Sequence, residues 1–208
     1  MHPTSFGRDK EEPERSKFDD FAAPETIVNQ ARRATPELEH LLDLFYEQPD
    51  TLGKFEEVDE SDMPEVYRGL LAHDKHMTVT VEAFHGCNVD VRVLETRVTK
   101  THYSRKILLT RQSDGAVVQY GIVRLNLDYL EKDARREIES QQTPLGRVLI
   151  KHNVLRTVRL LALWKIEPGE ELRKLFGLEG ATACFGRTAL IYCNGIPAVE
   201  LLEIVTPA

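Results

Sequence analysis

The feature that most constrains this fold is an alternation of apolar and polar residues that begins near residue 77. Successive side chains of a strand point to opposite faces of a sheet, so a period of two indicates strands with one buried face. Four segments rich in β-branched residues show this period. They are MTVTVEAF from residue 77, VDVRVLETRV from 89, YSRKILLTRQ from 103 and GAVVQYGIVRLNL from 115.

Short turns separate the predicted strands. His85-Gly86 and Asp114-Gly115 have the composition of hairpin connections. Asn194-Gly195 forms a third connection, between ATACFGRTALIYC and IPAVELLEIVTP near the C-terminus. VLRTVRLLALWKI, from residue 154, is a further strand. Tight hairpins join antiparallel strands, so the sequence predicts an antiparallel sheet.

Helical patterns flank these strands. TPELEHLLDLFYEQ begins with Thr35, Pro36 and Glu37, which favour a helix start. A short turn or helix is expected at PEVYRGLLAHD, and three further helices at LDYLEKDARREIESQ, TPLGRVLIKH and GEELRKLFG. Strands followed by helices and then by strands indicate an α+β domain.

Composition divides the chain into three parts. Residues 1–23 are polar and mixed in charge, which predicts a flexible tail. Residues 24–64 form a helical N-terminal extension that ends in an acidic loop over 49–64, and residues 65–208 form the main domain. A length of 208 residues with 41% hydrophobic side chains suits one such domain with its own core.

Several classes of protein are disfavoured. A formal net charge of -7 argues against a nucleic-acid partner. No apolar run is long enough to predict a membrane span, and the N-terminus lacks the apolar segment of a secretory signal. Cys87, Cys184 and Cys193 are scattered, which favours reduced thiols in a cytoplasm. The sequence predicts no oligomeric state.

Two strands carry charges on faces that are otherwise apolar. Arg105 shares its face with Tyr103, Ile107 and Leu109, and the last strand has Glu200 on one face and Glu203 on the other. An unpaired buried charge is costly. The pattern therefore allows a structural Arg105–Glu203 bridge, a β-bulge that turns a charge outward, or a pocket for an anion.

Four segments in order resemble the chorismate lyase (chorismate pyruvate-lyase) family, in its branch outside ubiquinone-making proteobacteria. They are LLAHDKHMTVTVE, YSRKILLTRQSDGAVVQYGIVRLNL, TPLGRVLIKH and NGIPAVELLEIVTP, and the resemblance covers about residues 65–207. It implies a chorismate-lyase-like α+β fold with about six antiparallel strands, covering helices and an internal ligand pocket. It also implies a carbon-oxygen lyase that eliminates pyruvate from chorismate to leave 4-hydroxybenzoate, without a metal or an organic cofactor.

The resemblance also implies site residues. Arg105 would pair with a carboxylate of the anionic substrate or of the aromatic acid product, and Arg105 and Glu203 would be the catalytic pair. Glu203 would also meet the ring hydroxyl, with Glu200 as a competing candidate. The remaining substrate-binding residues would be Met77 as an apolar wall, Leu145 and Gly146 through their backbone N–H groups, and His76.

A second hypothesis is a non-catalytic binding or sensing module for a small aromatic carboxylic acid. Ligand-sensing domains of GntR-type transcription regulators resemble the same fold, but residues 1–64 show one helix pattern and no basic recognition helix.

Other polar residues have two interpretations each. The histidines His73, His76, His85 and His102 invite a metal hypothesis, but no Cys or carboxylate set completes a site, so we expect no metal. Lys165, His152 and Asn153 would either add donors for a second carboxylate or face solvent. Arg156 and Arg159 have the spacing of surface strand residues, and Trp164 that of a core anchor.

Overall fold

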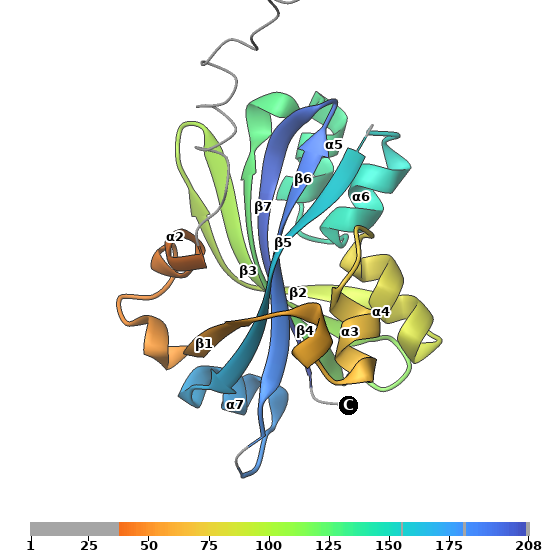
Figure 1. Cartoon of the computed structure of the whole chain (residues 1–208). Coiled ribbons are helices and arrows are strands. Elements are labelled where there is room, and N and C mark those ends of the chain that lie inside the picture. Colours follow the sequence, from red (N-terminus) through yellow and green to blue (C-terminus); the bar gives the residue numbers. More distant parts are fainter. Residues whose placement is uncertain (1–37, 155, 181, 207–208) are drawn as a thin grey trace, which may run out of the picture. The chain divides into compact units, whose positions relative to one another are not determined.

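The computed structural model describes residues 38–154, 156–180 and 182–206, and this part of the chain has the predicted α+β architecture. Its strands form a seven-stranded sheet in the order β1-β5-β6-β7-β4-β3-β2, with every neighbouring pair antiparallel (Figure 1). The strands are β1 (Gly53–Val58), β2 (Val89–Val98), β3 (His102–Arg111), β4 (Val117–Asn126), β5 (Arg156–Pro168), β6 (Cys184–Cys193) and β7 (Ile196–Val205).

Six α-helices lie in the described part of the chain. They are α2 (Leu38–Asp43), α3 (Glu65–Leu71), α4 (Met77–His85), α5 (Lys132–Glu139), α6 (Leu145–Lys151) and α7 (Glu170–Phe176). Single turns of 3₁₀-helix, η1 (Pro49–Thr51), η2 (Glu60–Asp62) and η3 (Leu127–Tyr129), link some of these elements. Among the described residues no helix is long and apolar enough to cross a membrane.

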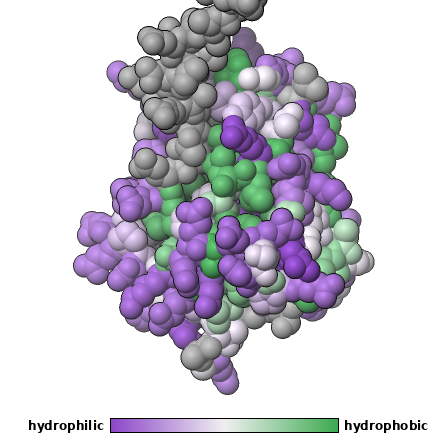
Figure 2. Space-filling model, viewed as in Figure 1, coloured by the Kyte–Doolittle hydropathy of each residue, from purple (hydrophilic) through white to green (hydrophobic). Residues whose placement is uncertain are grey.

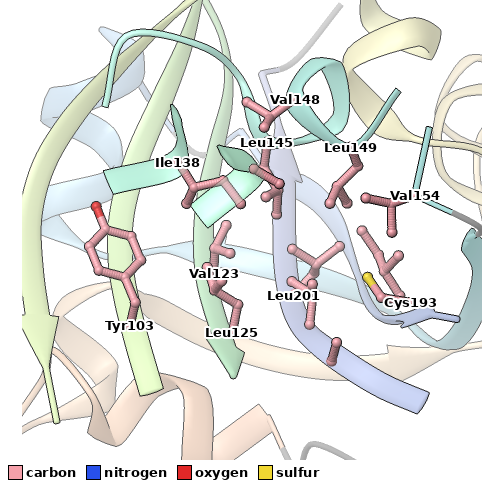
Figure 3. Close-up of a cluster of buried hydrophobic side chains, with 14 of the residues drawn as sticks. Tyr103, Val123, Leu125, Ile138, Leu145, Val148, Leu149, Val154, Cys193 and Leu201 are labelled. Carbon is pink, nitrogen blue, oxygen red and sulfur yellow. The ribbon is translucent and has the colours of Figure 1, made fainter. Parts of the chain in front are cut away.

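The helices cover both faces of the sheet. Residues of α3, α4, α5 and α6 pack on the face that carries Ile107, Val123 and Leu201, which we call the pocket face. Figure 3 shows this packing where Leu145 and Leu149 of α6 approach the sheet. Residues of α2 and α7 pack on the opposite face, which carries among others Leu108, Tyr120 and Leu202.

The face of the molecule seen in Figure 2 is predominantly polar. Figure 2 shows charged and polar side chains around the edge of the visible face and a smaller apolar area near its middle. This distribution agrees with a charged fraction of 29% and with an apolar core held between the sheet and its helices.

Most of the predicted elements are confirmed. The alternating segments from residues 89, 103 and 115 are β2, β3 and β4, and Asp114-Gly115 lies in the β3–β4 turn. Asn194 and Gly195 join β6 to β7 with φ angles of 53° and 82°, the left-handed conformation that a tight hairpin requires. The segments predicted as helices at PEVYRGLLAHD, TPLGRVLIKH and GEELRKLFG contain α3, α6 and α7.

The strand predicted at MTVTVEAF is wrong, because these residues form α4. Val79, Thr80 and Val81 have β-branched side chains, which favour strands in isolation. Met77 and Val81 are four residues apart and both are buried, so packing of a helical face overrides that preference. His85-Gly86 is accordingly no hairpin turn; Gly86 ends the helix with a φ angle of 64°.

The expected antiparallel sheet of about six strands is confirmed, with seven strands in the structure. The acidic loop expected over 49–64 is wrong, because this stretch contains the edge strand β1. It pairs with β5, and Phe55 contacts Trp164 edge-on with ring centroids 6.2 Å apart. Trp164 is thus a packing residue, as predicted. Charged Lys54, Glu56 and Glu57 hide the alternation of this edge strand.

Two further predictions have mixed outcomes. The long helix expected over 127–141 is shorter, because η3 precedes it and α5 begins at Lys132. The helix expected from residue 35 is present as α2, with Leu41 and Leu42 buried. The predicted start at Thr35–Glu37 and the predicted tail at 1–23 lie outside the described residues.

Candidate functional site

A pocket lies between the pocket face of the sheet and the first turns of α4 and α6. The empty space within it is about 520 Å³, a part of which is open to solvent. All six residues predicted as site residues line it, namely His76, Met77, Arg105, Leu145, Gly146 and Glu203. Residues that the sequence predicted as one site thus come from four separate elements, and the fold places all of them around one pocket.

Arg105, on β3, is the most unusual side chain of the pocket. Only 1% of its surface is exposed, and its Nε and Nη1 atoms are buried without a hydrogen-bond acceptor among the described residues. Burial lowers the pKa of Arg105, and Tyr103 on the same face raises it in partial compensation. A guanidinium keeps its proton at neutral pH, so the pocket contains an unneutralised buried cation.

Glu203, on β7, is paired with a different cation from the one considered in the sequence. Its Oε2 accepts a hydrogen bond of 2.8 Å from Nε of Arg187 on the neighbouring strand β6. The structural Arg105–Glu203 bridge is thus not formed. Arg187 is fully buried, and its other nitrogens donate to the backbone oxygens of Leu71, His73 and Lys75. Arg187 therefore ties the segment before α4 to the sheet.

Glu200 lies outside the pocket. In the regular β4–β7 register it pairs with Arg124, and Nη1 of Arg124 donates to Oε1 of Glu200 at 2.8 Å. Because Glu203 is three positions after Glu200 and side chains alternate along a strand, the two lie on opposite faces of β7. The register places Glu203, and not Glu200, on the pocket face.

Two helices begin at the pocket. His76 precedes α4 and Pro144 precedes α6, and the first helical hydrogen bonds are donated by Val79 and Arg147. The N–H groups of Met77, Leu145 and the residues next to them come before those bonds, so they can bind an acceptor in the pocket. Gly146 allows the two helices to approach, since a Cβ atom there would lie 3.0 Å from Oγ1 of Thr78.

His76 is held at the edge of the pocket by an arginine. Nε of Arg156 donates to Nε2 of His76 at 2.8 Å, which requires a neutral ring with its proton on Nδ1. Burial and the charges of Arg156 and Arg187 lower the pKa of His76 to about 4. The interpretation of Arg156 as a surface residue is wrong, since it is partly buried and bonded to a pocket residue.

The other candidates from the sequence lie outside the pocket. Lys165 is 3.9 Å from Glu56 of the edge strand, and His152 contacts Glu137 of α5 at 2.8 Å. Nδ1 of His73 lies 3.2 Å from Nη1 of Arg187. None of these side chains lines the pocket, so the expectation that they add donors to it finds no geometric basis.

Among the lining residues that were not predicted as site residues, Arg187 and Gln119 carry long, buried polar side chains. Both could have been found by the argument that identified Arg105. Arg187 is the charged residue of a strand face that also carries Phe185 and Ile191, and Gln119 shares its face with Gly121. A polar residue within an apolar alternating face is the common pattern.

No protein-family model matches the chain, and no curated protein matches it. The resemblance to chorismate lyases thus stays a prediction from the sequence.

Among solved structures, the chain is similar to PhnF from Mycobacterium smegmatis, with 14% identity, a TM-score of 0.45 and 64% of each chain covered. The effector domain of PhnF gives a TM-score of 0.46 at 14% identity, with 63% of this chain and 88% of that domain covered. A possible transcriptional regulator, YydK from Bacillus subtilis subsp. subtilis str. 168, gives 0.45 at 15% identity, with 88% and 90% covered.

The chain thus spans less than two thirds of PhnF. The prediction of an enzyme, a carbon-oxygen lyase, is wrong by this comparison. Of the similar structures named above, one is described as an effector domain and one as a possible transcriptional regulator, and none of the three is described as a lyase.

Proposed function

We propose that this chain is a non-catalytic binding or sensing module for a small aromatic carboxylic acid. The observation that carries the proposal is the buried guanidinium of Arg105, whose Nε and Nη1 have no acceptor among the described residues. Buried charges in native proteins are ordinarily paired, and an unpaired one destabilises the fold by several kcal/mol. A ligand that brings its own negative charge removes this cost on binding.

A carboxylate is the ligand group that fits best. Its two oxygens match the parallel N–H groups of a guanidinium in a bidentate pair, which a lysine cannot form. The starts of α4 and α6 add backbone N–H groups on the other side of the pocket, at Met77 and Leu145 among others. A small carboxylate held between Arg105 and these groups would satisfy donors from both sides.

The rest of the lining suits a flat apolar body. Hydrophobic side chains from eight elements surround the polar groups, and Gly121 in the middle of β4 adds no side chain of its own beside Ile107. A planar ring buries both faces in such a space, and the thioether of Met77 can adapt to it. The apolar lining residues include Met77, Val91, Ile107, Leu109, Val123 and Leu201.

Isothermal titration calorimetry with 4-hydroxybenzoate tests the proposal. Arg105→Met keeps much of the side-chain volume and removes the charge, so we expect affinity to fall about 100-fold, in keeping with about 3 kcal/mol for a buried charged pair. Arg92→Met is the matched control, because Arg92 is an exposed arginine on the neighbouring strand β2. That variant should bind like the parent protein.

Two results would contradict the proposal. One is equal affinity in the parent protein and in Arg105→Met, or no binding of any aromatic acid. The other is catalysed release of pyruvate from chorismate, measured with a coupled lactate dehydrogenase assay, which we expect to stay at the uncatalysed rate.

A further inference from the structure

We infer that Gln119 selects among aromatic acids for those with a hydrogen-bond donor opposite the carboxylate; this inference rests on the proposed function. Gln119 lies on β4 and lines the same pocket as Arg105. Only 2% of its surface is exposed, and its Oε1 atom is buried without a donor among the described residues. The pocket thus contains a second unsatisfied polar group, an acceptor, in addition to the cation.

The strand register separates these two groups. Gln119 is opposite Leu109 in the β3–β4 pair, and Arg105 is opposite Val123. Leu109 is four positions after Arg105, so the two backbone positions are roughly 13 Å apart along the strand. Ile107 and Gly121 form the row between them. The long side chains of Arg105 and Gln119 can therefore contact opposite ends of one ligand that lies over Gly121.

The chemistry of the two ends defines the ligand class. A buried carbonyl oxygen without a donor destabilises the folded protein, and a ligand hydroxyl or amine can supply the missing N–H or O–H. The preferred ligand would carry a carboxylate at one end of a ring and a donor at the other. An acid without that donor leaves Gln119 unsatisfied in the complex, and this loss of a hydrogen bond makes the site selective.

Glu203 is the alternative acceptor for such a donor. It lies diagonally next to Gln119, since Gly121 pairs with Glu203 and Gln119 with Val205. One oxygen of Glu203 already accepts a hydrogen bond from Arg187. Gln119 has no bond of this kind in the described part of the chain, so the ligand donor relieves a larger penalty at Gln119.

The experiment compares benzoate, 4-hydroxybenzoate and 4-methoxybenzoate by calorimetry. In the parent protein we expect 4-hydroxybenzoate to bind about tenfold more tightly than benzoate, which corresponds to roughly 1.4 kcal/mol. The methoxy compound has no donor and should gain nothing. In Gln119→Leu the affinities for benzoate and 4-hydroxybenzoate should become equal. Gln112→Leu is the control, because Gln112 lies in the exposed β3–β4 turn and bonds Asp90.

The outcomes separate this inference from the proposed function. Equal affinity for benzoate and 4-hydroxybenzoate in the parent protein, with binding still dependent on Arg105, would refute the role of Gln119 alone. So would a hydroxyl preference that survives in Gln119→Leu and disappears in Glu203→Gln. Absence of binding by all three acids would refute both. A melting temperature of Gln119→Leu at or above that of the parent protein is expected, because the variant removes an unsatisfied buried group.

Discussion

The two faces of the sheet treat buried cations differently, and neighbouring residues of β3 show it most directly. Lys106 is on the opposite face, 8% exposed, with Nζ at 3.0 Å from Glu171, 3.5 Å from Glu95 and 4.9 Å from the ring centre of Tyr46. Arg105 is on the pocket face, 1% exposed, and its Nε and Nη1 lack acceptors in the described residues. One cation is neutralised by carboxylates of the protein, and the other has two nitrogens without an acceptor, which the proposed ligand would supply.

Strand β4 repeats this difference. Tyr120, on the opposite face, shares a hydrogen bond of 2.9 Å with Tyr46, and burial raises the pKa of both phenols. Gln119, its neighbour, is on the pocket face and has an unsatisfied oxygen. Among the described residues, three of the four residues with buried unpartnered side-chain atoms, Tyr103, Arg105 and Gln119, are on the pocket face. On the opposite face Oε2 of Glu200 has no partner, although its Oε1 accepts a hydrogen bond from Arg124. Unsatisfied groups beside an empty space are typical of binding sites.

Arg187 differs from Arg105 because the protein itself supplies its acceptors on the pocket face. Its replacement should have the largest effect on stability among the proposed variants. Arg187→Met would leave the Glu203 carboxylate without its cation and three backbone oxygens without a donor. We expect the free energy of unfolding to fall by about 3–5 kcal/mol in urea titrations. Arg124→Met, which breaks a partly exposed pair, should cost about 1 kcal/mol or less. Similar losses in both variants would contradict a structural role specific to Arg187.

The neighbouring cations of β3 should respond in opposite directions. Arg105→Met removes an unpaired buried charge, so we expect the unliganded protein to gain about 1–3 kcal/mol in unfolding free energy. Lys106→Met breaks two ion pairs whose carboxylates are partly exposed, and should cost about 1 kcal/mol. Chemical denaturation of both variants measures whether the free energy of unfolding rises or falls relative to the parent protein. A destabilised Arg105→Met would mean that the arginine is structural, and the contrast between the faces would fail.

Much of this site was predictable because its charges violate the apolar pattern of their strands. Arg105 and Glu203 are recognisable in the sequence for that reason. The Arg187–Glu203 pair is not. The Asn194-Gly195 hairpin predicts that β6 and β7 are neighbours, but the register shift next to Tyr192, which places Arg187 opposite Glu203, is not recognisable in the sequence. The same limit explains α4. Its β-branched residues predict a strand locally, and only contacts of Met77 and Val81 with a distant part of the core favour a helix.

His76, at the edge of the pocket, should make the stability of the protein depend on pH. Its pKa is about 4 in the folded protein and 6.5 when exposed, so the folded state disfavours the proton. The resulting stability is complete above pH 6.5 and is lost as the pH falls toward 4. His76→Gln keeps an acceptor for Arg156 and cannot titrate. Its melting temperature should fall less than that of the parent protein between pH 6.5 and 4, and an identical fall would contradict this assignment.

The smallest expected effect tests the carboxylates of β7. Arg124 and Glu200 pair on the opposite face with side chains 20% and 22% exposed, whereas Arg187 and Glu203 have exposures of 0% and 10%. Double-mutant cycles with Arg→Met and Glu→Gln changes should give a coupling energy of about 0.2–1 kcal/mol for the first pair and a larger one for the second, because water screens the first.

Glu200→Gln alone should leave the affinity for 4-hydroxybenzoate unchanged. If it weakened binding as much as Glu203→Gln, the ligand would depend on both faces, and the division between them would be wrong.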